Sequence, residues 1–182
     1  MSPPPLPTRQ GPNIRLAFPE VSDAAELIAL HRVSQGLYHG LVTPFVTPEG
    51  FARYVERCRQ PNYVGLLLRR RSDDVILGSI NLSEIVRGPF QSAYLGYQIG
   101  APFARQGCMT EGLGLVLHYA FVRLKLHRLE ANIQPGNRPS LALVTRLGFR
   151  REGFSPRYLK IAGRWRDHER WAILAEDWRK KK

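Results

Sequence analysis

A strand that passes through a glycine-bearing loop into a helix can bind an anion, and residues 94–124 have this pattern. The apolar run 94–100 predicts a strand, and a long apolar helix is expected over 110–124. The loop between them contains Gly107. At such a helix start, unpaired backbone N–H groups and the positive end of the helix dipole point the same way. We therefore predict that residues 105–110 bind an anionic group.

The cysteines and histidines do not suggest metal or redox chemistry. Cys58 and Cys108 have no metal-binding or redox spacing, and they imply no disulfide framework. The five histidines form no H-x-x-x-H pair and no cluster with cysteine, so we expect no metal site. No histidine adjoins Cys108, which argues against nucleophilic catalysis by its thiol.

The N-terminal third of the chain predicts an arm, a strand and two helices. Residues 1–12 contain five prolines and are expected to form a flexible arm. The alternating run 14–18 suits a first strand. A helix is expected over 22–36, capped by Ser22 and ended by Gly36. A second helix is expected over 47–60 and begins at the pair Thr47-Pro48.

The rest of the chain is rich in β segments. Runs over 63–68, 75–86 and 93–100 predict three successive antiparallel strands. After the long helix we expect, in order, a strand over 128–133, a helix over 139–147, a strand over 149–154 and a hairpin over 158–175. With no repeat and no linker, residues 13–178 form one domain, followed by a basic tail over 179–182. This order indicates an α/β fold with helices on the faces of a mixed sheet.

Several motifs, together with this order of elements, resemble the GNAT acetyltransferases. Across residues 14–175 they are similar to the RimJ-type ribosomal-protein-alanine N-acetyltransferases. The motifs are Asn81-Leu-Ser-Glu-Ile-Val-Arg-Gly-Pro-Phe90, Tyr94-Leu-Gly-Tyr-Gln-Ile-Gly100, Asn137-x-x-Ser140, Arg146-Leu-Gly-Phe149 and Tyr158-Leu-x-Ile-x-Gly-x-Trp-Arg-Asp-His168. The resemblance implies a mostly antiparallel sheet of about seven strands with about four helices. It also implies acetyl-CoA as acetyl donor, with no metal.

The resemblance gives the anion site a ligand, because acetyl-CoA carries a pyrophosphate. The expected cofactor contacts are Ile99, Gly100, Arg105, Gln106, Gly107, Cys108, Met109, Thr110 and Asn137. In the family, the strand before the loop separates from the next strand, and pantetheine amides pair with its free edge at Ile99 and Gly100. Family members carry a Q/R-x-x-G-x-G/A loop, in which Pro102 and Arg105 here replace the first two conserved residues. Either Arg105 takes a strained backbone or its position does not require glycine; its side chain can also contact phosphate.

Acetyl transfer to an amine needs a neutral amine and a proton for the departing thiolate. An α-amine has a pKa of about 7.7–8.0 and is partly neutral at pH 7, unlike a lysine. N-terminal acetylation therefore needs less help from a general base than lysine acetylation does. This fits a site without an obvious catalytic carboxylate. The resemblance implies Ser140 as the acid near sulfur, although it can equally be a first-turn helix residue after Pro139. Tyr158 is a second candidate donor, or else a packed aromatic.

Three further residues are candidates for the site, and Asn137 has two possible roles there. Asn132 lies opposite the apolar face of its strand and can hold the acceptor or a water molecule. Asn137 can cap the last helix or contact the cofactor, and these roles are compatible. Arg87 and Tyr97 are expected to bind the acceptor. His168 is expected to pack and hydrogen-bond rather than to act in catalysis.

The charge balance favours a polyanionic partner. Lys and Arg outnumber Asp and Glu by 27 to 15, a net charge of +12. RNA, a ribosomal particle or a phosphate-rich cofactor fits this charge. Because 22 of the basic residues are arginine, genome composition is an alternative cause. Without an apolar signal segment or a membrane-length apolar run, the protein is expected to be cytoplasmic with no membrane partner; its oligomeric state stays open.

Three functions are compatible with these observations. The first is acetylation of the N-terminal alanine of a ribosomal protein. The second is acetylation of a small amine, such as a polyamine, an amino acid or an antibiotic, for which acidic cavity walls would be expected. The third is a non-catalytic basic factor for ribosome assembly or RNA binding that retains a cofactor fold.

Overall fold

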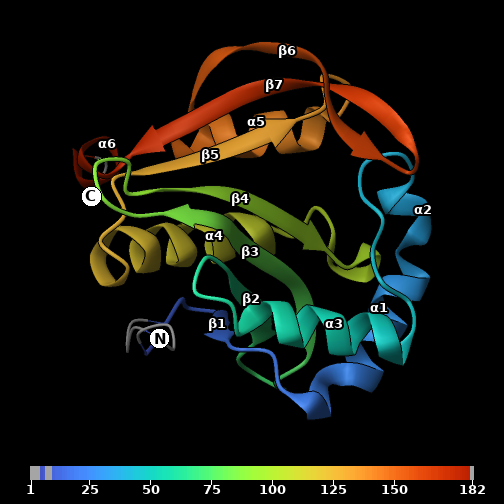
Figure 1. Ribbon diagram of the computed structural model, residues 1–182. Helices are drawn as coiled ribbons and strands as arrows, with labels where there is room; N and C mark the ends of the chain where they lie inside the picture. Colours follow the sequence, from blue (N-terminus) through green and yellow to red (C-terminus); the bar gives the residue numbers. More distant parts are fainter. Residues whose placement is uncertain (1–4, 7–9, 181–182) are drawn as a thin grey trace.

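The computed structural model describes residues 5–6 and 10–180 and contains one seven-stranded sheet (Figure 1). The strands lie in the order β1-β2-β3-β4-β5-β7-β6, and only the β4–β5 pair is parallel. They are β1 (Ile14–Ala17), β2 (Val64–Arg70), β3 (Ile76–Val86), β4 (Ser92–Ile99), β5 (Arg128–Ile133), β6 (Arg150–Ile161) and β7 (Arg164–Leu174). The predicted mixed, mostly antiparallel sheet of about seven strands is confirmed.

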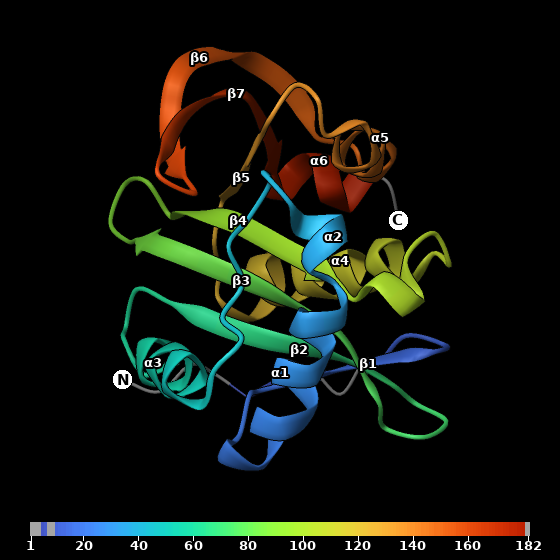
Figure 2. The same ribbon diagram turned by 90° about the vertical axis from the view of Figure 1, so that its right-hand side faces the viewer.

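Helices cover both faces of this sheet (Figure 2). The α-helices are α1 (Ala24–Val33), α2 (Gln35–Tyr38), α3 (Pro48–Cys58), α4 (Cys108–His118), α5 (Arg138–Leu147) and α6 (Ala175–Lys180). The 3-10 helices η1 (Val21–Asp23) and η2 (Ala101–Phe103) and the π-helical turn η3 (Tyr119–Arg123) are shorter. One buried cluster joins α1 and α3 to one face of the sheet, and a larger cluster joins α4 and α5 to the other.

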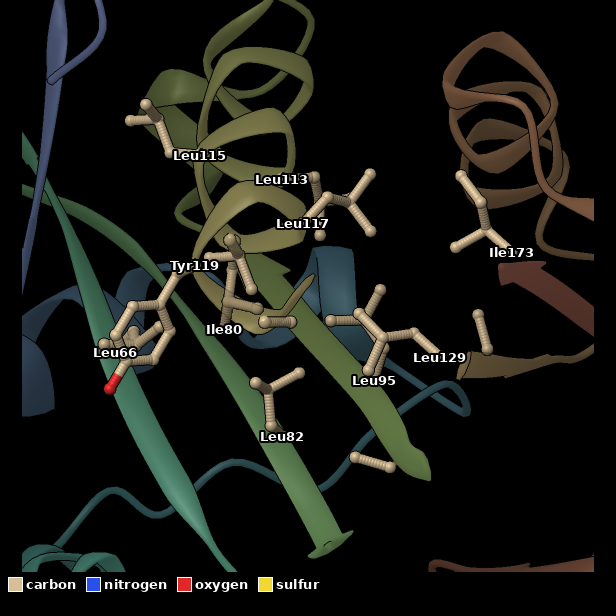
Figure 3. Packing of buried hydrophobic residues seen from close by; sticks show 14 of the residues in the cluster. Leu66, Ile80, Leu82, Leu95, Leu113, Leu115, Leu117, Tyr119, Leu129 and Ile173 are labelled. Carbon is tan, nitrogen blue, oxygen red and sulfur yellow. The ribbon is translucent and has the colours of Figure 1, made fainter. Parts of the chain in front are cut away.

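The larger cluster forms the main core beneath α4 (Figure 3). Leu113 of α4 is fully buried in this cluster, together with Ile80 of β3 and Leu129 of β5. On β2, Leu66 belongs to this cluster, whereas Leu67 belongs to the cluster under α1 and α3. The β2 sequence is therefore a continuous apolar run rather than an alternating one, because both faces of the strand are covered.

The predicted first helix is divided and differently capped. The N-cap prediction for its serine is wrong: Glu20 and Asp23 form a capping box, and the Asp23 carboxylate also pairs with Arg69. The helix does not end at Gly36 either. That glycine lies inside the short helix α2, after a break at Ser34, whose hydroxyl donates to Leu30 O (2.6 Å).

Other boundaries move for local reasons. The long helix begins at Cys108 rather than Thr110 and becomes π-helical at Tyr119. The two strands predicted on either side of residue 155 are one strand, β6. A register shift between Ser155 and Leu159 interrupts its pairing, and Arg157 takes a left-handed φ of 49° there.

The chain is already attached to the domain before the predicted boundary at residue 12. Gly11 is buried, and the Arg71 guanidinium donates to its carbonyl (3.0 Å). The Glu111 carboxylate accepts the backbone N–H groups of Asn13 and Ile14, which ties α4 to the start of β1. The rest of the predicted arm includes residues 1–4 and 7–9, and the predicted tail includes 181–182; these lie outside the described residues. In the described part of the chain, no helix is long and apolar enough to cross a membrane.

Candidate active site

The parallel strands β4 and β5 separate part-way along their length. They pair only over 92–94 and 128–130, and the last pair is Tyr94 with Glu130. Beyond that pair, β4 remains bonded to β3 and β5 to β7, so the two strands diverge (Figure 1). The edge of β4 that faces β5 is therefore free of strand pairing over residues 95–99.

A cavity of about 730 Å³ lies at this separation. Its floor comes from residues 95–99 of β4 and 131–133 of β5, and one end is formed by the loop before α4 and by α5. The other end has mostly apolar walls: Leu37, Tyr38, Leu41, Val42, Leu159 and Ile161. None of the residues that line it is an aspartate or a glutamate, whereas Arg105 and Arg146 are present. Among the described residues, no group of three His, Cys, Asp or Glu side chains could hold a metal ion.

The loop before α4 has the geometry of an anion site. Gly107 is the N-cap with a left-handed φ of 79°, and no side chain caps the helix. The first-turn N–H groups of Cys108, Met109 and Thr110 have no partner inside the helix, and all three residues line the cavity. Arg105 takes a left-handed φ of 62°, so the first of the two alternatives holds. Arg105 thus takes, at the position of the family glycine, a backbone region that glycine favours.

Most of the predicted cofactor residues lie together at this cavity. Ile99, Arg105, Gly107, Cys108, Met109, Thr110 and Asn137 all line it. Two others do not. The Gly100 N–H is already used by Leu77 O (2.8 Å), and Gln106 folds back to donate to Pro102 O (2.9 Å). Gln106 thus closes the loop rather than facing the cavity.

Ser140 and Tyr97 face each other across the cavity floor. Asn137 is the N-cap of α5, and its Oδ1 accepts the Ser140 N–H (3.3 Å), which places the Ser140 hydroxyl at the cavity. Burial raises the pKa of Tyr97 to about 12, and the neighbouring Ser140 hydroxyl partly offsets this rise. The Tyr97 hydroxyl is buried without a hydrogen-bond partner within the described residues and keeps its proton at neutral pH. Tyr97 therefore lies with the candidate acid.

The opposite face of the sheet presents a second polar group at the cavity, formed by Gln98, Asn132 and His168. The predicted orientation of Asn132 is confirmed, since its neighbours Ala131 and Ile133 are buried in the core. Gln98 and His168 were not predicted as site residues. Alternation along β4 could have placed Gln98 on this face, but no local signal brings His168 to it.

Arg87 and Tyr158, predicted for the acceptor and for the acid, are also not among the residues that line the cavity. Arg87 follows β3, next to the start of β4, and donates to Leu124 O (2.6 Å). Six residues of strand, roughly 20 Å, separate this end of β4 from Gln98. Tyr158 hydrogen-bonds Tyr94 and raises its pKa, and its ring lies 6.0 Å from that of His168. The register shift in β6 turns Leu159 rather than Tyr158 into the cavity.

Known proteins are similar to this chain in sequence and in fold. Residues 13–150 match the family model of the acetyltransferase (GNAT) domain. The chain belongs to the GNAT acetyltransferase family. It is an enzyme that uses acetyl-CoA as co-substrate and transfers the acetyl group to an amine.

Individual GNAT relatives are similar over different lengths. The probable N-acetyltransferase YjcK of Bacillus subtilis (strain 168) is 34% identical over 166 residues, which cover 87% of this chain and 92% of that protein. The ribosomal protein uS5-alanine N-acetyltransferase of Escherichia coli (strain K12) is 43% identical over 103 residues, covering 57% of this chain and 53% of that enzyme. The solved structure of Mycobacterium smegmatis RimJ in complex with CoA-disulfide has a TM-score of 0.81 at 26% identity, covering 90% of this chain and 82% of that one.

The cavity of this GNAT domain fits acetyl-CoA in two respects. The uncapped start of α4 and Arg105 supply donors for the pyrophosphate. The free edge of β4 over residues 95–99 supplies backbone groups that can pair with amides.

Proposed function

We propose that this enzyme acetylates the α-amine of an N-terminal alanine of a ribosomal protein. The observation that carries the proposal is the absence of any carboxylate among the residues that line the cavity. A polyamine carries several ammonium groups, and burying each needs an opposite charge. A protein N-terminus brings one amine, which is already about a tenth neutral at pH 7.

The names of relatives support the same acceptor. The Escherichia coli enzyme that is 43% identical over 103 residues acts on an alanine of ribosomal protein uS5. The net charge of +12 would favour approach to a ribosomal particle. Such an acceptor places the reaction in the cytoplasm.

The residues of the chain divide the chemistry between the two faces of the sheet. The start of α4 and Arg105 bind the phosphates, and the free edge of β4 orients the acetyl donor in the separation between β4 and β5. The amine approaches from the end lined by α2, β6 and β7. As the C–N bond forms and the C–S bond breaks, the Ser140 hydroxyl donates a proton to sulfur, with Tyr97 beside it to replace that proton.

Acetyl transfer to a synthetic alanine-starting peptide, compared with spermidine, tests the proposal. We expect kcat/KM for the peptide to exceed that for spermidine by at least about tenfold, because an unsatisfied buried polar group costs about 1–3 kcal/mol and a charged one more. Preference for spermidine would assign the enzyme to small amines. Thermal unfolding with and without acetyl-CoA accompanies the assay, because a ligand that binds only the folded form raises Tm. No shift at saturating acetyl-CoA would contradict both enzymatic functions and favour a non-catalytic one.

A further inference from the structure

The orientation of the Gln98 amide follows from its neighbours. His31 Nδ1 lies 2.8 Å from Phe45 O, and since a carbonyl only accepts, Nδ1 carries the proton. Burial lowers the pKa of His31, so the ring is neutral at pH 7 and its Nε2 is an acceptor. Gln98 Nε2 must therefore be the atom that faces it, at 3.0 Å, and it also donates to Ser79 Oγ (3.1 Å). Gln98 Oε1 is buried without a partner.

The same reasoning fixes the tautomer of His168. Its Nδ1 lies 2.9 Å from Arg166 O and must be the donor. In the neutral ring, Nε2 then keeps its lone pair. His168 is only 2% exposed, it lines the cavity, and no other hydrogen bond of its ring is found within the described residues. Asn132 Oδ1 is likewise buried without a partner.

These three side chains lie on one face of the sheet. Asn132 is paired with Arg170, so the two share a face, and His168 shares it by the two-residue period of β7. Gln98 bonds to α1, which covers the face opposite α4. Three strands that are separated in sequence thus bring three hydrogen-bond acceptors to one cavity, on the face away from Ser140.

We propose that Gln98 Oε1, Asn132 Oδ1 and His168 Nε2 receive the acceptor ammonium, and that His168 Nε2 removes one of its protons before attack. An ammonium offers three N–H donors, and the site offers three acceptors without internal partners. No carboxylate lines the cavity, so the imidazole Nε2 of His168 is the base that the site supplies. The proposal rests on the proposed function only in taking an amine as the second substrate.

The protons balance as follows. The ammonium transfers one proton to His168 Nε2, which later passes it to solvent. The neutral nitrogen then forms the C–N bond while the C–S bond breaks. A second proton leaves nitrogen, and one proton reaches sulfur on the Ser140 side. The net products are the acetylated amine, free CoA thiol and one released proton.

Several charged and titratable groups surround His168. They are Tyr158 on β6, Tyr38 on α2, and Arg166 and Arg170 on its own strand. Glu130 of β5 shares this face of the sheet, but its carboxylate pairs with Arg128 (2.8 Å) and it does not line the cavity.

A pair of substitutions separates this role from packing. In His168→Asn, the amide nitrogen can replace Nδ1–H and keep the bond to Arg166 O, but the Nε2 acceptor is lost. In His168→Ala both are lost. We expect kcat/KM at pH 7 to fall by about tenfold in both variants, because about a tenth of the α-amine is already neutral and needs no base. The deficit should shrink above pH 8, where the α-amine is neutral without help. His127→Asn is the matched control, because His127 is half-exposed and pairs with Glu176 outside the cavity.

Three results would overturn the proposal. They are near wild-type turnover of His168→Asn at pH 7, a deficit that does not change with pH, and an Nε2-protonated tautomer in long-range ¹H–¹⁵N NMR of the imidazole rings. Unchanged CoA binding confirms that the variants are folded. The variants are assayed with whichever acceptor the wild type uses, alanine peptide or spermidine. The acceptor preference of the wild type then tests the proposed function, and the variants test His168 separately. The NMR measurement decides even if neither amine is acetylated.

Discussion

Tyr94 on β4 and Glu130 on β5 form the last pair of the only parallel contact in the sheet. Beyond them β5 follows β7, with which it pairs over its whole length, while β4 follows β3. The separation therefore follows from the longer antiparallel pairings of β4 with β3 and of β5 with β7. It leaves one strand edge and two sets of polar side chains open to a cavity inside an otherwise continuous core.

Cysteine alkylation tests where CoA binds. Cys108 lines the cavity at the start of α4, whereas burial raises the pKa of the Cys58 thiol to about 11. With a pKa of about 11, only about one Cys58 side chain in a thousand is thiolate at pH 8. Because thiolate is the reactive form, Cys58 should react very slowly at this pH. We expect N-ethylmaleimide to label Cys108 in the free enzyme and CoA to block that labelling, as read by peptide mass spectrometry. Cys58 is the internal control and should stay unlabelled until the pH approaches 11. Labelling of Cys108 that saturating CoA leaves unchanged would place the cofactor elsewhere.

Arg105 combines a strained backbone with a charge at the cavity. Its φ of 62° costs a side-chain-bearing residue about 1 kcal/mol or more, which glycine does not pay. Arg105→Gly should therefore raise the free energy of unfolding by up to about 1 kcal/mol, less the cost of glycine in the unfolded chain. The same variant should weaken CoA binding roughly five- to tenfold through loss of a phosphate contact. Arg105→Asn separates the two effects, because asparagine tolerates this backbone region but carries no charge. Equal CoA affinity in all three proteins would show that the guanidinium makes no phosphate contact.

Local patterns predicted the strands well and the helix ends less well. The strand over 128–133 was predicted with its bounds because its alternation is regular. The first helix was misplaced because its start depends on Asp23, whose partner Arg69 is 46 residues away. The bulge in β6 was missed because no glycine marks the left-handed Arg157.

Most of the predicted cofactor residues line one cavity, whereas Gln98 and His168, which also line it, were not predicted. The loop before α4 and the Asn137–Ser140 helix start are local motifs, so sequence alone located them. The roles proposed for Gln98 and His168 rest on an amide orientation that His31 and Ser79 set and on a ring tautomer that the Arg166 carbonyl sets. Arg87 was predicted at the site because its motif precedes β4, but it lies near the start of β4, whereas the cavity lies along residues 95–99 of that strand.

The ion pair between Arg69 and Asp23 anchors the cap of α1 to β2. Their side chains are 12% and 6% exposed, so neither is well solvated. Arg69→Met leaves a buried carboxylate unpaired, and we expect it to cost about 3–5 kcal/mol of unfolding free energy in urea titration. Adding Asp23→Asn should recover part of that loss. The neighbouring Arg70→Met removes an exposed pair with Asp73 and should leave Tm almost unchanged. Equal losses of unfolding free energy for Arg69→Met and Arg70→Met would show that the buried pair with Asp23 stabilises the fold no more than the exposed pair with Asp73.

Ser140→Ala tests the acid assigned to the other face of the sheet. The backbone N–H of residue 140 still reaches Asn137 Oδ1 in this variant, so the cap of α5 is kept and only the hydroxyl at the cavity is lost. We expect kcat to fall by about a hundredfold, the lower range for a proton donor in the transition state, with the Kd for CoA changed by less than about twofold. Thr145→Ala is the control, since it removes a hydroxyl from the same helix that bonds Leu141 O (2.8 Å) and does not line the cavity. Because Tyr97 keeps its proton at neutral pH and lies beside Ser140, Tyr97→Phe should lower kcat as well, and the double variant should lose less than the product of the two effects if they act as one relay. Unchanged turnover in Ser140→Ala would remove this serine from the mechanism and leave Tyr97 as the donor to sulfur.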